Sequence, residues 1–373
     1  MAVDPRVLAN LTVDRPVTLV SGTNGKTTTT RLIAETLGSQ RSVAATRGAN
    51  MPAGLVAAAR SQCDELVLEV DELYVPRVLA ETRATVLVLL NISRDQLDRI
   101  SEIRRIAEAW RSAIAGADWQ LTVVANADDP LVVWAVGGHR DVVWIAAGDR
   151  WRQDGALCPQ CSTVQTGGRS GAAWRCECGF ALPEAQWTFS STELHGPGLD
   201  IPFHPLLPGG VNIANAATAV AVAVARGLNA AIAAAAVVRV GSVAGRYVVT
   251  QIGDRPARLL LAKNPASWTE TLHMLEGGVS PVVICVNARG ADGKDTSWLW
   301  DVPFEHLAGR CVAATGDRRW DLSLRLETAG VEHKVTEDPI AAVATLPRSS
   351  APIEVVATYT AFHDLLDRLG VSW

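Results

Sequence analysis

The chain has 373 residues, a formal net charge of −5 and seven cysteines. This length exceeds one ordinary hydrophobic core and predicts two domains. The small acidic excess gives no bulk attraction for nucleic acid or anionic lipid, so we expect no nucleic acid partner. No apolar run is long enough to cross a bilayer, and no export signal opens the chain. We therefore expect a cytoplasmic protein without a transmembrane segment.

A phosphate-binding loop is predicted near the start of the chain. Residues 17–20 are mainly apolar (Val-Thr-Leu-Val), residues 21–28 read Ser-Gly-Thr-Asn-Gly-Lys-Thr-Thr, and helix-forming residues continue to Leu37. Glycines let backbone N–H groups surround an anion, a lysine reaches the outer phosphates, and a threonine hydroxyl can bind Mg²⁺. Val20 replaces the usual first glycine, and an ordinary strand-to-helix turn is the alternative. We expect nucleotide binding by Gly22, Thr23, Asn24, Gly25, Lys26, Thr27 and Thr28.

Strand and helix signals alternate after this loop, which predicts a doubly wound α/β domain. The apolar run 66–70 contains Glu69 near its end, and runs 84–90 and 121–125 are each followed by polar residues. Ligands bind at the carboxyl ends of the strands in such a sheet. Glu69 is therefore a predicted Mg²⁺ ligand together with Thr27. The alternative is that Glu69 ends a strand in solvent.

Four of the seven cysteines form two close pairs within a segment rich in Gly, Ser and Thr. Four thiolates suit a structural tetrahedral Zn²⁺ site, which can order a segment too small for its own core. The second pair has only one residue between its cysteines, which is shorter than usual. We expect Zn²⁺ ligation by Cys158, Cys161, Cys176 and Cys178. Cys63, Cys285 and Cys311 lie in or beside apolar runs and are expected to be buried.

The later part of the chain predicts a second, smaller α/β domain. Asn212 and Asn215 fall on one side of a predicted helix start and are candidates to contact a base or ribose, with helix capping as the alternative for Asn212. From about residue 247 a new alternation of apolar runs and helices begins. Its predicted strand ends carry the polar segments 263–266, 287–301, 315–318 and 358–361.

Loop 22–28, the strand end 69–72 and the segment 91–99 together resemble the central ATPase domain of the Mur ligases. The resemblance implies a fold of α/β class: a P-loop Mur ligase central domain over 1–245, with a four-cysteine zinc-ribbon insertion at about 151–185, and a C-terminal domain over 246–373. The substrate domain that usually precedes the loop is not seen here. The resemblance also implies that Asn212 and Asn215 contact ATP and that Arg246 reaches the phosphates.

The four-cysteine segment, Lys263 to Ala266 and the tryptophan-rich acidic segment 291–301 are similar to the MurT family. That family implies the synthetase subunit of lipid II isoglutaminyl synthase. It implies MgATP-dependent amidation of the α-carboxyl of D-glutamate in the lipid II stem peptide, via an acyl phosphate, at the cytoplasmic face of the membrane. Ammonia would come from the glutaminase-type subunit GatD, in a heterodimer or higher assembly.

The same family implies that an aspartate of this chain completes the catalytic triad of the glutaminase. The candidates are Asp295, which we favour, and Asp292, and the alternative for both is a solvated turn. Trp298 and Trp300 are expected to be exposed at the partner interface. Two other functions stay open: a stand-alone Mur or folylpolyglutamate type ligase that adds an amino acid, and a non-catalytic nucleotide-binding module.

Overall fold

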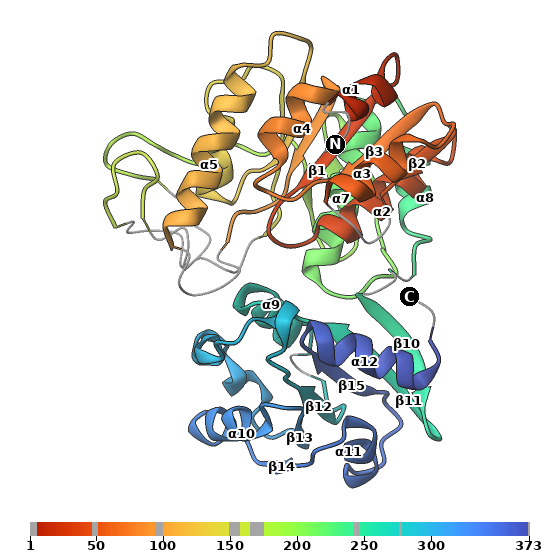
Figure 1. The fold of residues 1–373 in the computed structure, drawn as a ribbon, viewed down its shortest axis with the longest axis vertical. Coiled ribbons are helices and arrows are strands. Elements are labelled where there is room, and N and C mark those ends of the chain that lie inside the picture. The colour runs from red at the N-terminus through yellow and green to blue at the C-terminus, as the bar shows by residue number, and fades with distance from the viewer. Residues whose placement is uncertain are drawn as a thin grey trace. The chain divides into compact units, whose positions relative to one another are not determined.

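The computed structural model describes residues 6–46, 51–93, 100–148, 157–164, 175–241, 243, 246–275 and 278–371. The chain separates into two compact units. Unit 1 comprises residues 1–94 and 99–241, and unit 2 comprises residues 95–98 and 242–373. Each unit is described by itself below, and Figure 1 labels many of the elements.

Unit 1 is built on a six-stranded parallel sheet with the strand order β2-β3-β1-β4-β5-β6. Every residue of the three central strands is buried, because helices cover both faces and parallel strands then read as continuous apolar runs. The expected doubly wound domain is confirmed. The strands are β1 (Val17–Ser21), β2 (Val43–Ala45), β3 (Glu65–Glu69), β4 (Val86–Leu89), β5 (Thr122–Asn126) and β6 (Val142–Ile145).

Two helical layers enclose this sheet. A large apolar cluster joins one sheet face to α1, α3, α4, α5 and α6, and it includes the fully buried Trp110. Helices α2, α7 and α8 pack on one another, and the many buried alanines of α7 permit this close approach. The helices are α1 (Val7–Thr12), α2 (Lys26–Leu37), α3 (Pro52–Ala59), α4 (Val75–Thr82), α5 (Ile100–Ala115), α6 (Pro130–Val136), α7 (Gly210–Ala225) and α8 (Ala230–Val237).

A small antiparallel sheet in unit 1 was not predicted. It consists of β7 (Thr188–Phe189), β8 (Glu193–Gly196) and β9 (Leu199–Pro202). Trp187 lies against Gly196 so closely that a Cβ on Gly196 would be 2.6 Å from the indole ring. The strands are too short and too polar for hydrophobic periodicity to reveal them.

Unit 2 contains a second six-stranded sheet, with the order β10-β11-β15-β12-β13-β14. The hairpin β10–β11 is antiparallel, and the other neighbours are parallel. The expected second α/β fold is confirmed. The strands are β10 (Tyr247–Ile252), β11 (Arg255–Leu261), β12 (Val282–Cys285), β13 (Val312–Thr315), β14 (His333–Val335) and β15 (Ile353–Ala357).

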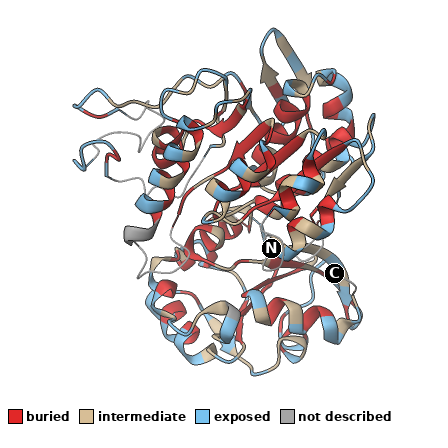
Figure 2. Ribbon diagram, turned by 45° about the horizontal axis from the view of Figure 1, so that its top comes forward, coloured by how far each residue is buried: buried red, intermediate tan, exposed pale blue. Residues whose placement is uncertain are grey.

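Alternate residues of this sheet enter two separate cores. Leu260 belongs to the same core as Trp268, whereas Leu259 belongs to the same core as Phe362. Figure 2 colours the buried residues of the chain red. The helical segments are α9 (Pro265–Leu275), α10 (Arg319–Thr328), α11 (Pro339–Thr345) and α12 (Tyr359–Leu369), with 3₁₀ turns η1 (Gly290–Asp292), η2 (Ser297–Asp301) and η3 (Phe304–Leu307).

Three expectations about burial are wrong. Cys311 is exposed and Cys63 is only partly buried, while Cys285 is buried as expected. Trp298 is 8% exposed because its ring packs 5.8 Å from that of Trp268 inside the core, whereas Trp300 is 54% exposed. Within the described residues, no helix is both long and apolar enough to span a membrane.

Candidate active site

The loop between β1 and α2 has the backbone shape that its glycines allow. Gly22 has φ +144° and Gly25 has φ +86°, a region that residues with a Cβ rarely adopt. A Cβ on Gly22 would lie 2.9 Å from the backbone nitrogen of Asn91, and one on Gly25 would lie 3.0 Å from Asn215 Oδ1. Both glycines are therefore required by conformation and by space.

Asn91, at the end of β4, holds the loop by two reciprocal hydrogen bonds. The backbone N–H of Asn24 donates to Asn91 Oδ1 at 2.9 Å, and Asn91 Nδ2 donates to the Asn24 carbonyl at 3.0 Å. Thr23 adds a second tie, because its hydroxyl pairs with the backbone N–H and C=O of Ser93. The remaining residues of the segment, 94–99, lie outside the described part of the chain.

Lys26, Thr27 and Glu69 converge at the carboxyl ends of β1 and β3, where Val20 lies beside Glu69 in register. Thr27 Oγ1 is 3.2 Å from Glu69 Oε1. Glu69 is 4% exposed, and its buried Oε2 has no hydrogen-bond partner among the described residues. A buried carboxylate oxygen is costly without a cation or donor. This oxygen pair fits Mg²⁺, which prefers carboxylate and hydroxyl ligands.

Asn215 lies beside the loop, since its amide oxygen faces Gly25. Its amide group donates to Asn212 Oδ1 at 3.4 Å, and Asn212 donates to the Pro208 carbonyl at 2.6 Å. The N-cap of α7 is Gly209, so neither asparagine caps the helix. Thr28 is buried in the first turn of α2. Arg246 belongs to unit 2, just before β10, and its contact with nucleotide stays a prediction.

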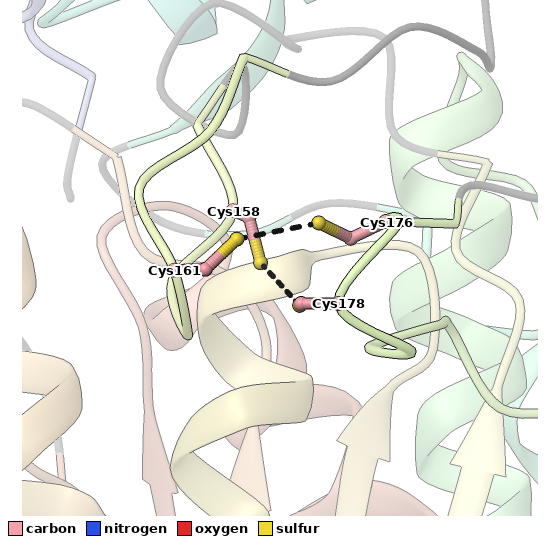
Figure 3. A group of neighbouring side chains, drawn as sticks. All are labelled: Cys158, Cys161, Cys176 and Cys178. Atoms are coloured by element: carbon pink, nitrogen blue, oxygen red, sulfur yellow. Dashed lines mark hydrogen bonds between the residues drawn. The ribbon is translucent and has the colours of Figure 1, made fainter.

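Figure 3 shows the four clustered cysteines pointing toward one another, and their Sγ atoms all lie within 4.8 Å. Cys161 Sγ is 3.4 Å from Cys176 Sγ, and Cys158 Sγ is 3.7 Å from Cys178 Sγ. Zn–S bonds of about 2.3 Å in a tetrahedron separate the sulfurs by roughly 3.8 Å. Hydrogen bonding with Thr163 lowers the pKa of the Cys161 thiol to about 6, whereas burial raises the pKa of the Cys158 thiol, so of these two only Cys161 favours the thiolate by itself. The arrangement fits Zn²⁺.

Each cysteine pair sits on a tight turn. The first turn is closed by hydrogen bonds from Cys158 N to Thr163 O and from Ser162 N to Cys158 O, and the second by Cys176 N to Phe180 O and Gly179 N to Cys176 O. Arg104 of α5 holds the first turn by donating to Ser162 Oγ and the Pro159 carbonyl. The short spacing of the second pair is therefore compatible with four converging sulfurs.

The two candidate aspartates of unit 2 have different surroundings. Asp292 accepts hydrogen bonds from the Thr360 hydroxyl, from Thr360 N at 2.8 Å and from Arg289 N at 3.2 Å. Asp295 is exposed and accepts one from the Ser297 N–H at 2.8 Å, which lowers the pKa of its carboxyl. Asp292 thus serves the fold of the loop, while Asp295 is accessible.

Two contributors to this site were missed as such by sequence reasoning. Asn91 was noted only as part of a motif, although a polar residue directly after a buried strand is a signal for a loop contact. Glu72 lies in the strand end 69–72, and the sequence predicts no separate role for it. Its carboxylate lies 3.0 Å from the Lys26 ammonium.

Comparisons with known proteins find relatives of both parts of the chain. The Mur ligase middle domain model matches residues 20–223, and the MurT ligase C-terminal model matches residues 261–362. The chain is 31% identical to the lipid II isoglutaminyl synthase (glutamine-hydrolyzing) subunit MurT of Staphylococcus aureus strain COL, over 96% of this chain and 88% of that protein. It is 29% identical to the subunit of the same name from Streptococcus pneumoniae, over 97% and 90%.

Among solved structures, a pseudomurein peptide ligase type C from Methanothermus fervidus superposes with a TM-score of 0.71. The two sequences are 18% identical, and the match covers 97% of this chain and 80% of the other. At this level of identity, the match shows that the two proteins share a fold.

Proposed function

This chain belongs to the Mur ligase family and, within it, to the MurT subunits, and from that premise we propose that it is the synthetase subunit of a lipid II isoglutaminyl synthase. The enzyme is a ligase that forms a carbon–nitrogen bond with glutamine as nitrogen donor. It amidates the α-carboxyl of D-glutamate in the lipid II stem peptide to D-isoglutamine during peptidoglycan synthesis.

The observation that carries the proposal is the convergence of Lys26, Thr27 and Glu69 at one edge of the sheet. The N–H groups of the loop and the start of α2 suit the nucleotide phosphates, with Lys26 for the outer ones. Thr27 and Glu69 would hold Mg²⁺, which neutralises the phosphate charge when bound. Asn212 and Asn215 would contact the nucleoside, and Arg246 would contact the phosphates.

The chemistry needs activation because a carboxylate is a poor acyl donor. The substrate carboxylate oxygen attacks the γ-phosphorus, the bond from that phosphorus to the ADP oxygen breaks, and an acyl phosphate forms. Ammonia then attacks the acyl carbon, the carbon–oxygen bond to phosphate breaks, and the nitrogen loses a proton. Lys26 stabilises the charge that spreads over the transferred phosphoryl group.

The nitrogen source in this proposal is a separate glutaminase-type subunit of the GatD kind. Cys285 of this chain is unsuited to that role, because burial raises the pKa of its thiol to about 11. Asp295 is proposed to orient the histidine of the glutaminase, with Trp300 at the interface. The four cysteines would hold a structural Zn²⁺ that orders the segment at about 151–185. We propose a domain boundary near residue 245. We also propose that the enzyme acts at the cytoplasmic face of the membrane, where lipid II is anchored.

The test is amidation by the purified complex. With lipid II, MgATP and glutamine, the chain and its glutaminase should form isoglutamine, detected by mass spectrometry. Without the partner, added ammonium should replace glutamine, because the acyl phosphate accepts any ammonia. If this chain alone incorporated an amino acid, it would be a stand-alone ligase. If it turned over no ATP under any condition, it would be a non-catalytic nucleotide-binding module.

A further inference from the structure

The ammonium group of Lys26 is fully occupied by acceptors from the protein itself. Its Nζ lies 3.0 Å from Glu72 Oε2, 2.5 Å from the Gly22 carbonyl oxygen and 3.4 Å from the Thr23 carbonyl oxygen. An ammonium has three donors, so these three acceptors satisfy it. The side chains of Lys26 and Glu72 are only 6% and 13% exposed, so water screens their attraction weakly. A phosphate that binds Lys26 therefore has to displace an existing partner.

Glu72 is held in place by its own backbone. Its carbonyl accepts a hydrogen bond at 2.9 Å from the indole of Trp110, which is fully buried in α5. Tyr74 N bonds to the Asp71 carbonyl, and α4 begins at Val75. The backbone of Glu72 is thus held by contacts within unit 1, and its carboxylate is held by Lys26.

Two carboxylates near the end of β3 contact different residues of the phosphate-binding loop. Glu69 contacts the hydroxyl of Thr27, and Glu72 contacts the ammonium of Lys26. Glu69 retains an oxygen without a partner among the described residues, which suits a metal ion. Glu72 instead presents a negative charge to the cation that the phosphates require. The two residues therefore have opposite expected effects on nucleotide affinity.

We propose that Glu72 is a positioning residue that holds Lys26 over the loop in the absence of nucleotide and competes with the nucleotide phosphates for its charge. This inference rests on the proposed function, because it takes the phosphates to bind at this loop. Bound nucleotide breaks the Lys26–Glu72 pair. The released carboxylate of Glu72 then repels the negative charge of the nucleotide phosphates. Both effects lower affinity. When ADP leaves, the pair forms again and favours release.

The test substitutes Glu72 in the full chain and measures binding of a non-hydrolysable ATP analogue with Mg²⁺ by titration calorimetry. Glu72→Gln keeps the shape and removes the charge, and we expect Kd to fall about tenfold, as the loss of a weakly screened charge predicts. The matched control is Glu81→Gln, because Glu81 is 18% exposed and pairs with Arg77 at 2.6 Å within the same unit. Its Kd should equal that of the wild type.

The outcomes separate this inference from the proposed function. If Lys26→Met abolishes binding while Glu72→Gln binds as the wild type or more weakly, Glu72 is only structural and the inference is wrong. If the wild type binds no nucleotide, or Lys26→Met binds as well as the wild type, the proposed function itself fails. Should Glu72→Gln not fold, Glu72→Asp shortens the side chain and weakens the pair, and its Kd should fall by a smaller factor.

Discussion

The backbone N–H of Thr360 donates a hydrogen bond of 2.8 Å to the carboxylate of Asp292, and this contact joins η1 to the start of α12. Asp295, three residues further along, is exposed and bonds to Ser297 within its own turn. The two aspartates of one loop therefore have separate expected functions, of which one is structural and the other is directed to a partner.

Asp295→Asn should abolish glutamine hydrolysis by the complex while association with the glutaminase is retained. The reason is that an amide cannot stabilise a charged histidine as a carboxylate does, and loss of this orienting charge reduces kcat by as much as about 10⁴ in related triads. Ammonium-dependent amidation should continue at the normal rate. Glutamine turnover and co-purification are measured together, and unchanged hydrolysis would remove Asp295 from the triad.

Asp292→Asn should instead destabilise the fold. Its carboxylate accepts three hydrogen bonds, and an amide would direct a donor toward one of those N–H or O–H groups. Because Asp292 is only partly buried, we expect a cost near the lower end of the about 1–3 kcal/mol for a buried mismatch. Urea unfolding measures the loss. If stability stayed normal while glutamine hydrolysis disappeared, the assignments of the two aspartates would have to be exchanged.

Gly25→Ala should weaken both folding and nucleotide binding. Gly25 has φ +86°, and the new Cβ would lie 3.0 Å from Asn215 Oδ1. The expected cost is roughly 1–3 kcal/mol. Gly138→Ala is the control, because nothing lies within 4 Å of its Cβ position and its φ is outside the positive region. Thermal unfolding of the two variants should differ clearly, and equal stability would show that the loop adapts.

Glu69→Gln should raise the Mg²⁺ concentration needed for half-maximal ATP turnover. The substitution removes the charge beside Thr27 while it leaves the shape of the site. Loss of an outer-shell partner alone typically weakens metal affinity by about 10–100-fold, so loss of the charge of a direct ligand should weaken it at least as much. Mg²⁺ titration of ADP release measures the change. Saturating Mg²⁺ should restore part of the rate. An unaltered Mg²⁺ dependence would place the metal elsewhere.

Removal of zinc should unfold the cysteine-rich segment without abolishing the core of unit 1. Cys158→Ser leaves three thiols, so bound zinc per chain, measured by mass spectrometry of the metal, should fall toward zero. Limited proteolysis should then cut between residues 157 and 181. Cys63→Ser is the control, because Cys63 lies outside the cluster. Wild-type protein free of zinc as purified, yet resistant to protease, would contradict a structural site.

The stability of the chain should fall at acid pH partly through Asp317. Its hydrogen bonds with the Arg289 guanidinium, at 2.5 and 2.9 Å, hold the pKa of the Asp317 carboxyl below its usual range. A lowered folded-state pKa contributes stability above roughly pH 4, the ordinary carboxyl value, and the contribution is lost as pH falls through the lower folded value. Urea unfolding between pH 7 and 3 should show a shallower slope for Asp317→Asn. Parallel curves would contradict this.

The sequence was sufficient for the strand–loop–helix unit around Lys26, because the residue types, their order and their spacing are all local. It was insufficient where burial depends on distant neighbours. Trp298 appeared to belong to an exposed acidic loop, but its ring packs on Trp268 of α9. Cys311 stands beside an apolar strand, yet that strand begins one residue later, at Val312, and the thiol is exposed.

The ion pair between Lys26 and Glu72 was unpredictable for the same reason, since 46 residues separate the partners. Periodicity places Glu72 just after a strand, but only the parallel pairing of β1 with β3 brings that strand end beside the loop. Convergence of the four cysteines was predictable, because ligand type and paired spacing are themselves the signal.

The two hydrogen bonds between Asn24 and Asn91 span 67 positions of the chain. Closing so long a segment costs conformational entropy before the contact contributes any stabilising energy. Contacts between residues far apart in sequence therefore slow folding. The phosphate-binding loop therefore reaches its final conformation only after β4 has paired with β1, although the loop itself is a short, continuous segment. During synthesis, a nascent chain that ends before Asn91 would contain the whole phosphate-binding sequence but could not yet hold the loop in its binding conformation.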